Sequence, residues 1–192
     1  MNVKYFNMRL ALTILFLGGL SFGCHSQNKQ TNTKQMDTHN EKKHPAYSRT
    51  DSNKVILKDE EWKKILPGDV YYIARQKGTE RPFTSPFETL KDVGTYYCAV
   101  CGNALFKSDT KFESGCGWPS FYEPVSKGSI IYLPDNTHGM TRTEVQCGRC
   151  KSHLGHVFED GPPPTGLRYC INGVVLDFEK AKEAGKKYDE KQ

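Results

Sequence analysis

Tyr96-Tyr-Cys-Ala-Val-Cys-Gly102, followed later by Val145-Gln-Cys-Gly-Arg-Cys-Lys151, decides the fold of this 192-residue chain. Each stretch carries two cysteines at the Cys-x-x-Cys spacing, which lets one turn present two thiolates to one metal ion. Gly102 and Gly148 lie beside or within the pairs and permit a tight turn. Four thiolates complete a closed tetrahedral site, so we predict one structural zinc ion per chain. The predicted ligands are Cys98, Cys101, Cys147 and Cys150.

Two other interpretations of the cysteine pairs remain open. Exported proteins favour disulfides, and a single Cys-x-x-Cys pair can also be a redox centre like that of thioredoxin. A disulfide within Cys-x-x-Cys closes a very short loop and therefore constrains little of the chain. Zinc is the favoured interpretation, and because 45 residues separate the two pairs, the metal would join two distant hairpins.

The sequence around the pairs predicts an α+β fold made mainly of antiparallel β-structure. Residues 59–66 and 69–76 have helical patterns, with Pro67-Gly68 ending the first, Asp69 capping the second and Gly78 ending it. Short runs rich in β-formers follow, and strands never alternate with helices, which argues against a parallel sheet. The predicted strands are 96–100, 129–133, 141–145, 167–171 and 174–178, and residues 179–188 are predicted to form a weak closing helix.

The net charge of +5 does not indicate nucleic-acid binding, because the excess lies outside the main domain. Residues 51–192 contain 20 basic and 20 acidic residues, and the whole positive excess belongs to the first 50 residues. A neutral body lacks the basic surface that nucleic acid requires. We therefore expect no nucleic-acid partner.

The first 50 residues resemble an export signal followed by a spacer. Residues 1–23 combine a basic start with an apolar run too short to span a bilayer as a helix, which is typical of a signal peptide. Cys24 then resembles the lipidated cysteine of a bacterial lipoprotein, although Ser21 departs from the usual cleavage pattern. Residues 24–50 are polar and are predicted to be a flexible tether, in which His25, His39 and His44 would be solvated. We therefore expect a lipid-anchored envelope protein with its domain at 51–192, the alternatives being a soluble exported protein or an uncleaved anchor.

Two cysteines, Cys116 and Cys170, remain after the zinc ligands and Cys24 are assigned. Cys170 lies in a predicted strand, where Arg168 and Asn172 share its face. A neighbouring cation or hydrogen-bond donor stabilises a thiolate, so this placement suits a nucleophile. A buried structural role is the alternative for each cysteine.

Several strings together resemble the B-type methionine sulfoxide reductases across about residues 55–178. They occur in the family's order, and no one of them alone would be specific. The strings are Gly78-Thr-Glu-Arg-Pro-Phe83, Gly115-Cys-Gly-Trp-Pro-Ser-Phe121, Thr143-Glu-Val145, His153-Leu-Gly-His-Val-Phe158, Pro164-Thr-Gly166 and Arg168-Tyr-Cys-Ile-Asn172. The resemblance implies short N-terminal helices followed by two antiparallel sheets joined by the zinc site.

The resemblance also implies a mechanism based on two cysteines. Cys170 would attack the sulfur of methionine R-sulfoxide in oxidised proteins or peptides, leaving a sulfenic acid. Cys116 would convert that sulfenic acid into a disulfide, and a thioredoxin-like dithiol would then reduce the enzyme. Envelope proteins would be repaired in this way. If the resemblance is misleading, the chain would instead be a zinc-containing β module that only binds partners.

The other residues implied by the resemblance surround Cys170. The sulfoxide oxygen must be protonated before it leaves, and two histidines in a predicted loop would serve this step, His156 being preferred for proton delivery. The remaining roles are thiolate stabilisation by Arg168, oxygen or water binding by His153 and Asn172, and substrate contact by Trp118 and Phe158. The alternatives are a metal half-site for the histidine pair, a core position for Trp118 and a surface ion pair for Arg168.

Two departures from the family pattern stand out. Gly173 occupies a position where many relatives have serine, and residues 85–90 match no family string. The missing hydroxyl at 173 lies next to the catalytic strand and would alter a local hydrogen bond without touching the proposed chemistry.

Overall fold

The computed structural model describes residues 43–181. Two helices, α1 (Asp59–Ile65) and α2 (Gly68–Gln76), come first, as predicted. Leu66 is extended because Pro67 follows it, so α1 stops there. Lys77, rather than the predicted Gly78, takes the left-handed conformation that ends α2. Within residues 43–181, no helix has both the length and the apolar character of a membrane span.

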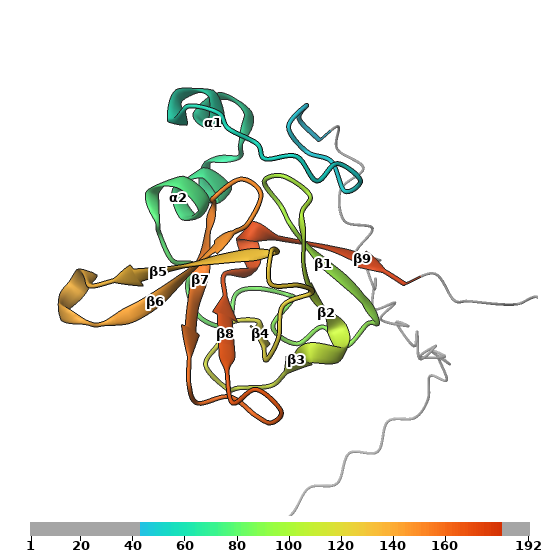
Figure 1. Cartoon of the computed structure of the whole chain (residues 1–192), viewed down its shortest axis with the longest axis vertical. Coiled ribbons are helices and arrows are strands. Elements are labelled where there is room, and N and C mark those ends of the chain that lie inside the picture. Colours follow the sequence, from blue (N-terminus) through green and yellow to red (C-terminus); the bar gives the residue numbers. More distant parts are fainter. Residues whose placement is uncertain (1–42, 182–192) are drawn as a thin grey trace, which may run out of the picture. The chain divides into compact units, whose positions relative to one another are not determined.

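Two antiparallel sheets follow the helices, which confirms the predicted fold class (Figure 1). The three-stranded sheet has the order β2 (Ala104–Lys107), β1 (Gly94–Cys98), β9 (Leu176–Lys180). The six-stranded sheet has the order β3 (Lys111–Phe112), β4 (Ser120–Phe121), β8 (Arg168–Ile171), β7 (His153–Phe158), β6 (Arg142–Cys147), β5 (Ile130–Asp135). Three 3₁₀ turns, η1 (Ser108–Thr110), η2 (Thr137–Gly139) and η3 (Gly173–Val175), connect the strands.

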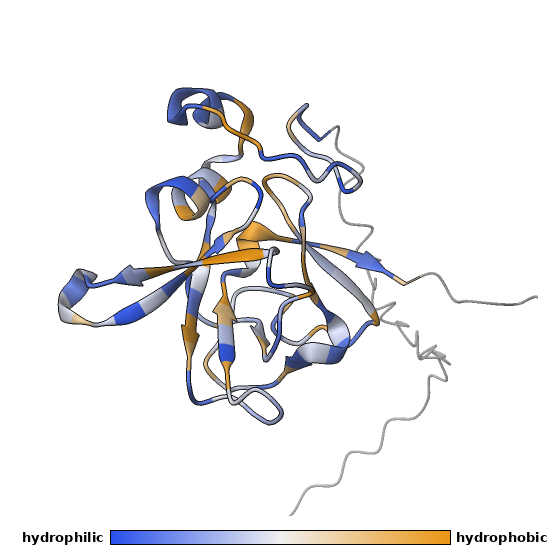
Figure 2. Cartoon of the chain, viewed as in Figure 1, coloured by the Kyte–Doolittle hydropathy of each residue, from blue (hydrophilic) through white to orange (hydrophobic). Residues whose placement is uncertain are grey.

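An aromatic cluster joins the two sheets. Phe106 of the three-stranded sheet stacks on Phe121 of the six-stranded sheet with ring centroids 4.4 Å apart, and Tyr96 meets Phe121 edge-on at 4.9 Å. All three rings are fully buried, so their burial supplies much of the hydrophobic free energy between the sheets. In Figure 2, hydrophilic residues predominate along α1, and β7 and β8 each contain apolar residues. The opposite face of the six-stranded sheet is thereby left for the functional residues.

Two predicted elements are wrong. The loop predicted around His153 and His156 is the strand β7, which pairs with β6 and β8. The predicted helix at 179–188 begins with Glu179 and Lys180, which instead belong to β9 and pair with β1. Residues 182–188 of that prediction lie outside the described residues.

The C-terminal end of the predicted tether packs on the domain, so the boundary at residue 50 is wrong. The backbone N–H of Ser48 donates to the carbonyl of Cys101, and the Arg149 guanidinium donates to the carbonyl of Ser48. Arg49 pairs with the buried carboxylate of Asp177 at 2.9 Å. His44, predicted to be solvated, lies edge-on to Trp62 with ring centroids 6.0 Å apart. The buried side chains of Asp177 and Arg149 on the domain thus bind a segment whose composition alone does not predict folding. Residues 24–42 of the predicted tether lie outside the described residues.

Candidate active site and metal centre

The four predicted zinc ligands form one buried cluster. Their sulfur atoms all lie within 4.8 Å of one another, with Cys98 and Cys150 3.8 Å apart and Cys101 and Cys147 3.6 Å apart. A zinc–sulfur bond of about 2.3 Å gives a tetrahedral sulfur–sulfur edge of about 3.8 Å. The donor set and spacing therefore fit a tetrahedral metal ion. Such an ion would join the ends of β1 and β6, which belong to different sheets.

The two cysteine turns have the same backbone geometry. Gly102 N–H donates to the carbonyl of Cys98, and Lys151 N–H donates to the carbonyl of Cys147. Gly102 (φ 78°) and Lys151 (φ 60°) both take the left-handed conformation. The sequence predicted a conformational role for Gly148, which is wrong. A Cβ at Gly148 would lie 2.1 Å from the carbonyl oxygen of Gly128, so this glycine permits close packing instead.

Cys116 and Cys170, the other two cysteines of the described residues, face each other. Cys170 lies on β8, Cys116 lies on the loop before β4, and their sulfur atoms are 3.4 Å apart. A disulfide needs the sulfur atoms to approach to about 2.05 Å, a short movement for a loop. Gly115 and Gly117 on either side of Cys116 both have positive φ, so this loop conformation favours glycine there. The pair can therefore form a disulfide with little rearrangement.

The reduced pair carries negative charge more easily on Cys116 than on Cys170. Burial raises the pKa of Cys170 to about 12, the neighbouring Cys116 adds to the rise, and Arg168 opposes it. Burial also disfavours the Cys116 thiolate, but the hydroxyl groups of Ser114 and Ser120 outweigh it and lower the pKa of Cys116 to about 7. The two shifts have opposite directions, so the surroundings favour a thiolate at Cys116 more than at Cys170.

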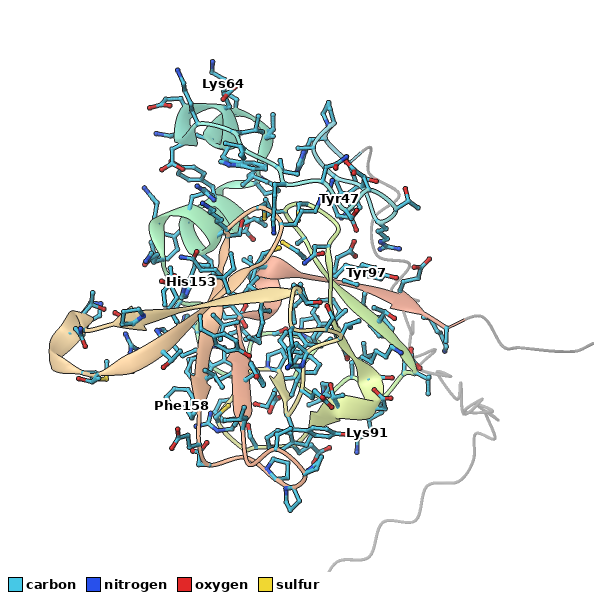
Figure 3. All side chains as sticks on the ribbon, in the orientation of Figure 1. Tyr47, Lys64, Lys91, Tyr97, His153 and Phe158 are labelled. Atoms are coloured by element: carbon cyan, nitrogen blue, oxygen red, sulfur yellow. The ribbon has the colours of Figure 1, made fainter. Side chains whose placement is uncertain are left out.

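A β-bulge brings the two histidines to the face of Cys170. Residues three apart in a regular strand point to opposite faces, but Leu154 is an extra residue opposite the β6 strand. His153 and His156 therefore project together, with ring centroids 5.5 Å apart. His156 is the direct cross-strand neighbour of Cys170. Figure 3 labels His153 at the end of β7 nearer the helices and Phe158 at the far end.

Each histidine is hydrogen-bonded to a carboxylate. His153 Nδ1 lies 2.7 Å from Oε1 of the buried Glu144, and His156 Nε2 lies 2.7 Å from Oδ2 of Asp135. Burial lowers the pKa of His153, and Glu144 opposes that effect. Neither carboxylate was predicted from the sequence, because both come from the neighbouring β5–β6 hairpin.

Comparison with known proteins agrees with this arrangement. Residues 66–180 match the SelR domain family. The chain is 59% identical over 119 residues to a peptide methionine sulfoxide reductase MsrB of Pseudomonas putida, a region that covers 62% of this chain and 90% of the relative. It is 56% identical over 128 residues to the MsrB of Agrobacterium fabrum, covering 67% of this chain and 95% of that protein. The chain belongs to the MsrB family. It is accordingly an oxidoreductase, as the resemblance implied.

The MsrB site continues from Cys170 along β8 to Arg168. The Arg168 guanidinium donates two hydrogen bonds of 2.8 Å to Asp160 and lies 4.4 Å from the ring centroid of Phe158. Arg168 therefore forms the ion pair considered as an alternative and also lies close enough to lower the pKa of Cys170. Arg168, Asp160 and Cys116 line an open cleft of about 500 Å³.

Asn172 and Trp118 are both held by Glu80, a residue that the sequence analysis did not single out. Glu80 N–H donates to Asn172 Oδ1, and Trp118 Nε1 donates to the carbonyl of Glu80. The amide group of Asn172 also donates to the carbonyl of Leu154, so both ends of this side chain contact main-chain groups. Trp118 is only partly buried, unlike an ordinary core residue.

The two departures from the MsrB pattern, Gly173 and Ser85, meet in space. A Cβ added at Gly173 would lie 1.8 Å from Ser85 Oγ and 2.5 Å from Ser85 Cβ. The Ser85 side chain therefore fills the volume that a serine at 173 would need.

We predict that Gly155→Ala separates β7 from β8 and weakens both folding and activity. A Cβ at this position would lie 2.0 Å from the carbonyl oxygen of Cys170. This oxygen belongs to the backbone, so the clash cannot be relieved by a change of side-chain rotamer. The expected loss is about 1–3 kcal/mol in free energy of unfolding, measured by urea denaturation. Gly68→Ala is the matched control, since nothing lies within 4 Å of its Cβ position, and it should leave stability unchanged. Equal stability of both variants would contradict the close approach.

Proposed function

We propose that this chain reduces protein-bound methionine R-sulfoxide to methionine, with Cys170 as nucleophile and Cys116 as resolving cysteine. The observation that carries the proposal is the 3.4 Å separation of these two sulfur atoms on the sheet face that also presents His153 and His156. The relatives named peptide methionine sulfoxide reductase support the substrate class. The distance supports a disulfide between the two cysteines, and the position of Cys170 beside His156 and near Arg168 supports Cys170 as the nucleophile.

The first step transfers oxygen from the methionine sulfur to Cys170. Cys170 loses its thiol proton to water and attacks as the thiolate, which the neighbouring Arg168 stabilises. The sulfur–oxygen bond of the substrate breaks while a protonated histidine, preferably His156, supplies a proton to that oxygen. Methionine sulfur is reduced by two electrons, and Cys170 is oxidised to a sulfenic acid. Trp118 and Phe158 would contact the methyl group and side chain of the substrate.

The second step forms the disulfide. Cys116 attacks the sulfur of the Cys170 sulfenic acid, and the sulfenic hydroxyl leaves with the thiol proton of Cys116 as water. A thioredoxin-like dithiol then supplies two electrons and two protons to restore both thiols. Because Cys116 lines the open cleft, the reductant can approach from that side.

The metal in the cysteine cluster is proposed to be zinc. Cys98, Cys101, Cys147 and Cys150 are all buried and leave no open coordination position, so the ion would be structural. When bound, zinc would hold the four thiolates together and keep the ends of β1 and β6 in contact.

Cys116→Ser tests the proposed function directly. We expect the variant to release one equivalent of methionine per chain and then to stop when thioredoxin is the only reductant, because no disulfide forms. With dithiothreitol, which attacks the sulfenic acid itself, slow turnover should continue. Methionine release is measured by chromatography from a peptide carrying R- or S-sulfoxide, and only the R form should react. Normal turnover of the variant with thioredoxin would exclude the resolving role.

We also propose that the chain is exported and anchored to a membrane through Cys24. The support is the sequence of residues 1–24 alone, since these residues lie outside those described. Anchoring would place repair at oxidised envelope proteins and would require a partner that delivers electrons across the membrane. Mass spectrometry of the mature N-terminus should find a diacylglyceryl group on Cys24. An unmodified mature chain that begins elsewhere would rule out the anchor.

A further inference from the structure

The two histidines of the site use opposite ring nitrogens to contact their carboxylates. His153 bonds Glu144 through Nδ1, whereas His156 bonds Asp135 through Nε2. A carboxylate only accepts hydrogen bonds, so each contacted nitrogen must carry the proton. In the neutral rings, Nε2 of His153 and Nδ1 of His156 are then the free nitrogens.

Glu144 is built to hold this arrangement. Its side chain is 2% exposed, yet each oxygen is occupied: Oε2 accepts from Lys77 at 2.7 Å, and Oε1 accepts from Gln146 at 3.1 Å and from His153. A buried carboxylate is retained only when its oxygens are paired in this way. Its pKa is lowered because these hydrogen bonds outweigh the burial that opposes them. The carboxylate is therefore charged and can hold an imidazole proton at Nδ1.

Asp135 bonds His156 from strand β5, which forms a hairpin with the strand β6 that carries Glu144. Its Oδ2 also accepts from Arg142 at 2.7 Å, and its Oδ1 accepts from the hydroxyl and the backbone N–H of Thr137. Hydrogen bonds from Thr137, followed by the bond with His156, keep the pKa of Asp135 well below its usual range. The two carboxylates therefore contact the histidines from the neighbouring strands, Asp135 from β5 and Glu144 from β6.

We propose that Glu144 and Asp135 are positioning residues that hold His153 and His156 as opposite tautomers, so that Nε2 of one ring and Nδ1 of the other face the sulfoxide oxygen bound at Cys170. A free nitrogen that gains a proton becomes the acid, and the carboxylate behind it stabilises the resulting imidazolium. That proton ends on the oxygen of the Cys170 sulfenic acid. The inference rests on the proposed function, because it assigns these nitrogens to that reaction.

The experiment begins with the wild-type chain, so that it does not depend on any variant folding. Nitrogen-15 NMR of the reduced protein labelled at histidine should show His153 protonated at Nδ1 and His156 at Nε2 in their neutral forms. His153→Asn and His156→Asn spectra serve only to assign the signals. An active wild-type protein with the reverse tautomer at either ring would overturn the inference while leaving the proposed function intact.

Three variants then test whether the histidine tautomers determine the single-turnover rate of sulfoxide reduction. Glu144→Leu cannot accept a hydrogen bond and should lose the His153 signature and at least about tenfold in single-turnover rate, with little change in KM. Glu144→Gln retains a carbonyl oxygen that can accept the hydrogen bond from His153. Lys77, which loses its charged partner in this variant, is exposed enough to be solvated instead. The tautomer signature of His153 and most of the activity lost in Glu144→Leu should therefore be retained in Glu144→Gln. Asp135→Leu should change the signature of His156 alone.

Asp177→Leu is the matched control, because Asp177 is an equally buried, ion-paired carboxylate in the three-stranded sheet. It should lower the Tm without changing either histidine signature or the single-turnover rate. A wild-type rate in Glu144→Leu, or an equal rate loss in Asp177→Leu, would show that Glu144 contributes stability only. Loss of activity in every protein, including the wild type, would instead count against the proposed function.

Discussion

Replacing Cys170 with serine is expected to abolish methionine sulfoxide reduction, with a loss of at least about 10³-fold in single-turnover rate. A serine hydroxyl ionises far less readily than a thiol, and its oxygen cannot take up a second oxygen as a sulfenic acid does. The measurement is methionine release from an R-sulfoxide peptide in the presence of dithiothreitol. This reductant bypasses the natural recycling partner, so the result depends only on the nucleophile.

The fold should survive this change, because serine is smaller than cysteine and Cys170 is only partly buried. Cys170→Ser should therefore keep the Tm of the wild type. Cys116→Ser is the control, since it removes the facing thiol at 3.4 Å and should still complete one turnover. If Cys170→Ser retained full activity, the mechanism would be wrong. If both variants lost the first turnover, Cys116 would be needed for the attack itself, and a purely resolving role would be wrong.

The features predicted correctly from sequence depend on local structure. Acids at the start of residues 59–66 and Pro67 after them define α1, and short runs rich in β-formers define most strands. The Cys-x-x-Cys spacing defines each metal-binding turn, because both ligands of a pair lie on one turn. The contact between the two turns belongs to the tertiary structure. The sequence indicates it only because four thiolates together would complete one metal site.

Features that depend on contacts between distant segments were predicted only through the family resemblance or not at all. The pairing of Cys116 with Cys170 spans 54 residues and is visible in sequence only by likeness to MsrB proteins. The carboxylates Glu144 and Asp135 face the histidines from another strand, and spacing along the chain gives no sign of them. Glu80 holds Asn172 and Trp118 through its main-chain N–H and carbonyl groups, which a search for reactive side chains does not find.

The strand β7 was predicted as a loop, and Gly155 lies inside it. An isolated glycine inside a strand pattern is also the sign of a bulge, and this interpretation would have placed both histidines on one face. The tether boundary failed for a different reason. Residues 43–50 are polar and bury little apolar surface of their own, but Asp177 and Arg149 on the domain offer buried charges that they satisfy. Composition predicts whether a segment can fold alone, and not whether a folded surface binds it.

Removing the metal is expected to unfold the domain. Zinc bound by four cysteines contributes about 10–16 kcal/mol of apparent binding free energy in small peptides, which is comparable with the whole stability of about 5–15 kcal/mol of a typical domain. The cluster joins β1 to β6, and Arg149 between its last two cysteines also binds the carbonyl groups of Ser48 and Cys101. Loss of the ion would therefore release both the sheet junction and the N-terminal segment.

The measurement is metal content by elemental analysis together with thermal unfolding before and after chelation under reducing conditions. We expect one zinc per chain, loss of the cooperative transition after chelation, and the same loss in Cys101→Ser. Cys116→Ser, which changes a cysteine outside the cluster, should retain both the metal and the Tm. A metal-free, reduced wild-type protein with an unchanged cooperative transition would show that the two sheets hold together without the ion. The aromatic contacts among Tyr96, Phe106 and Phe121 would then be sufficient to join them.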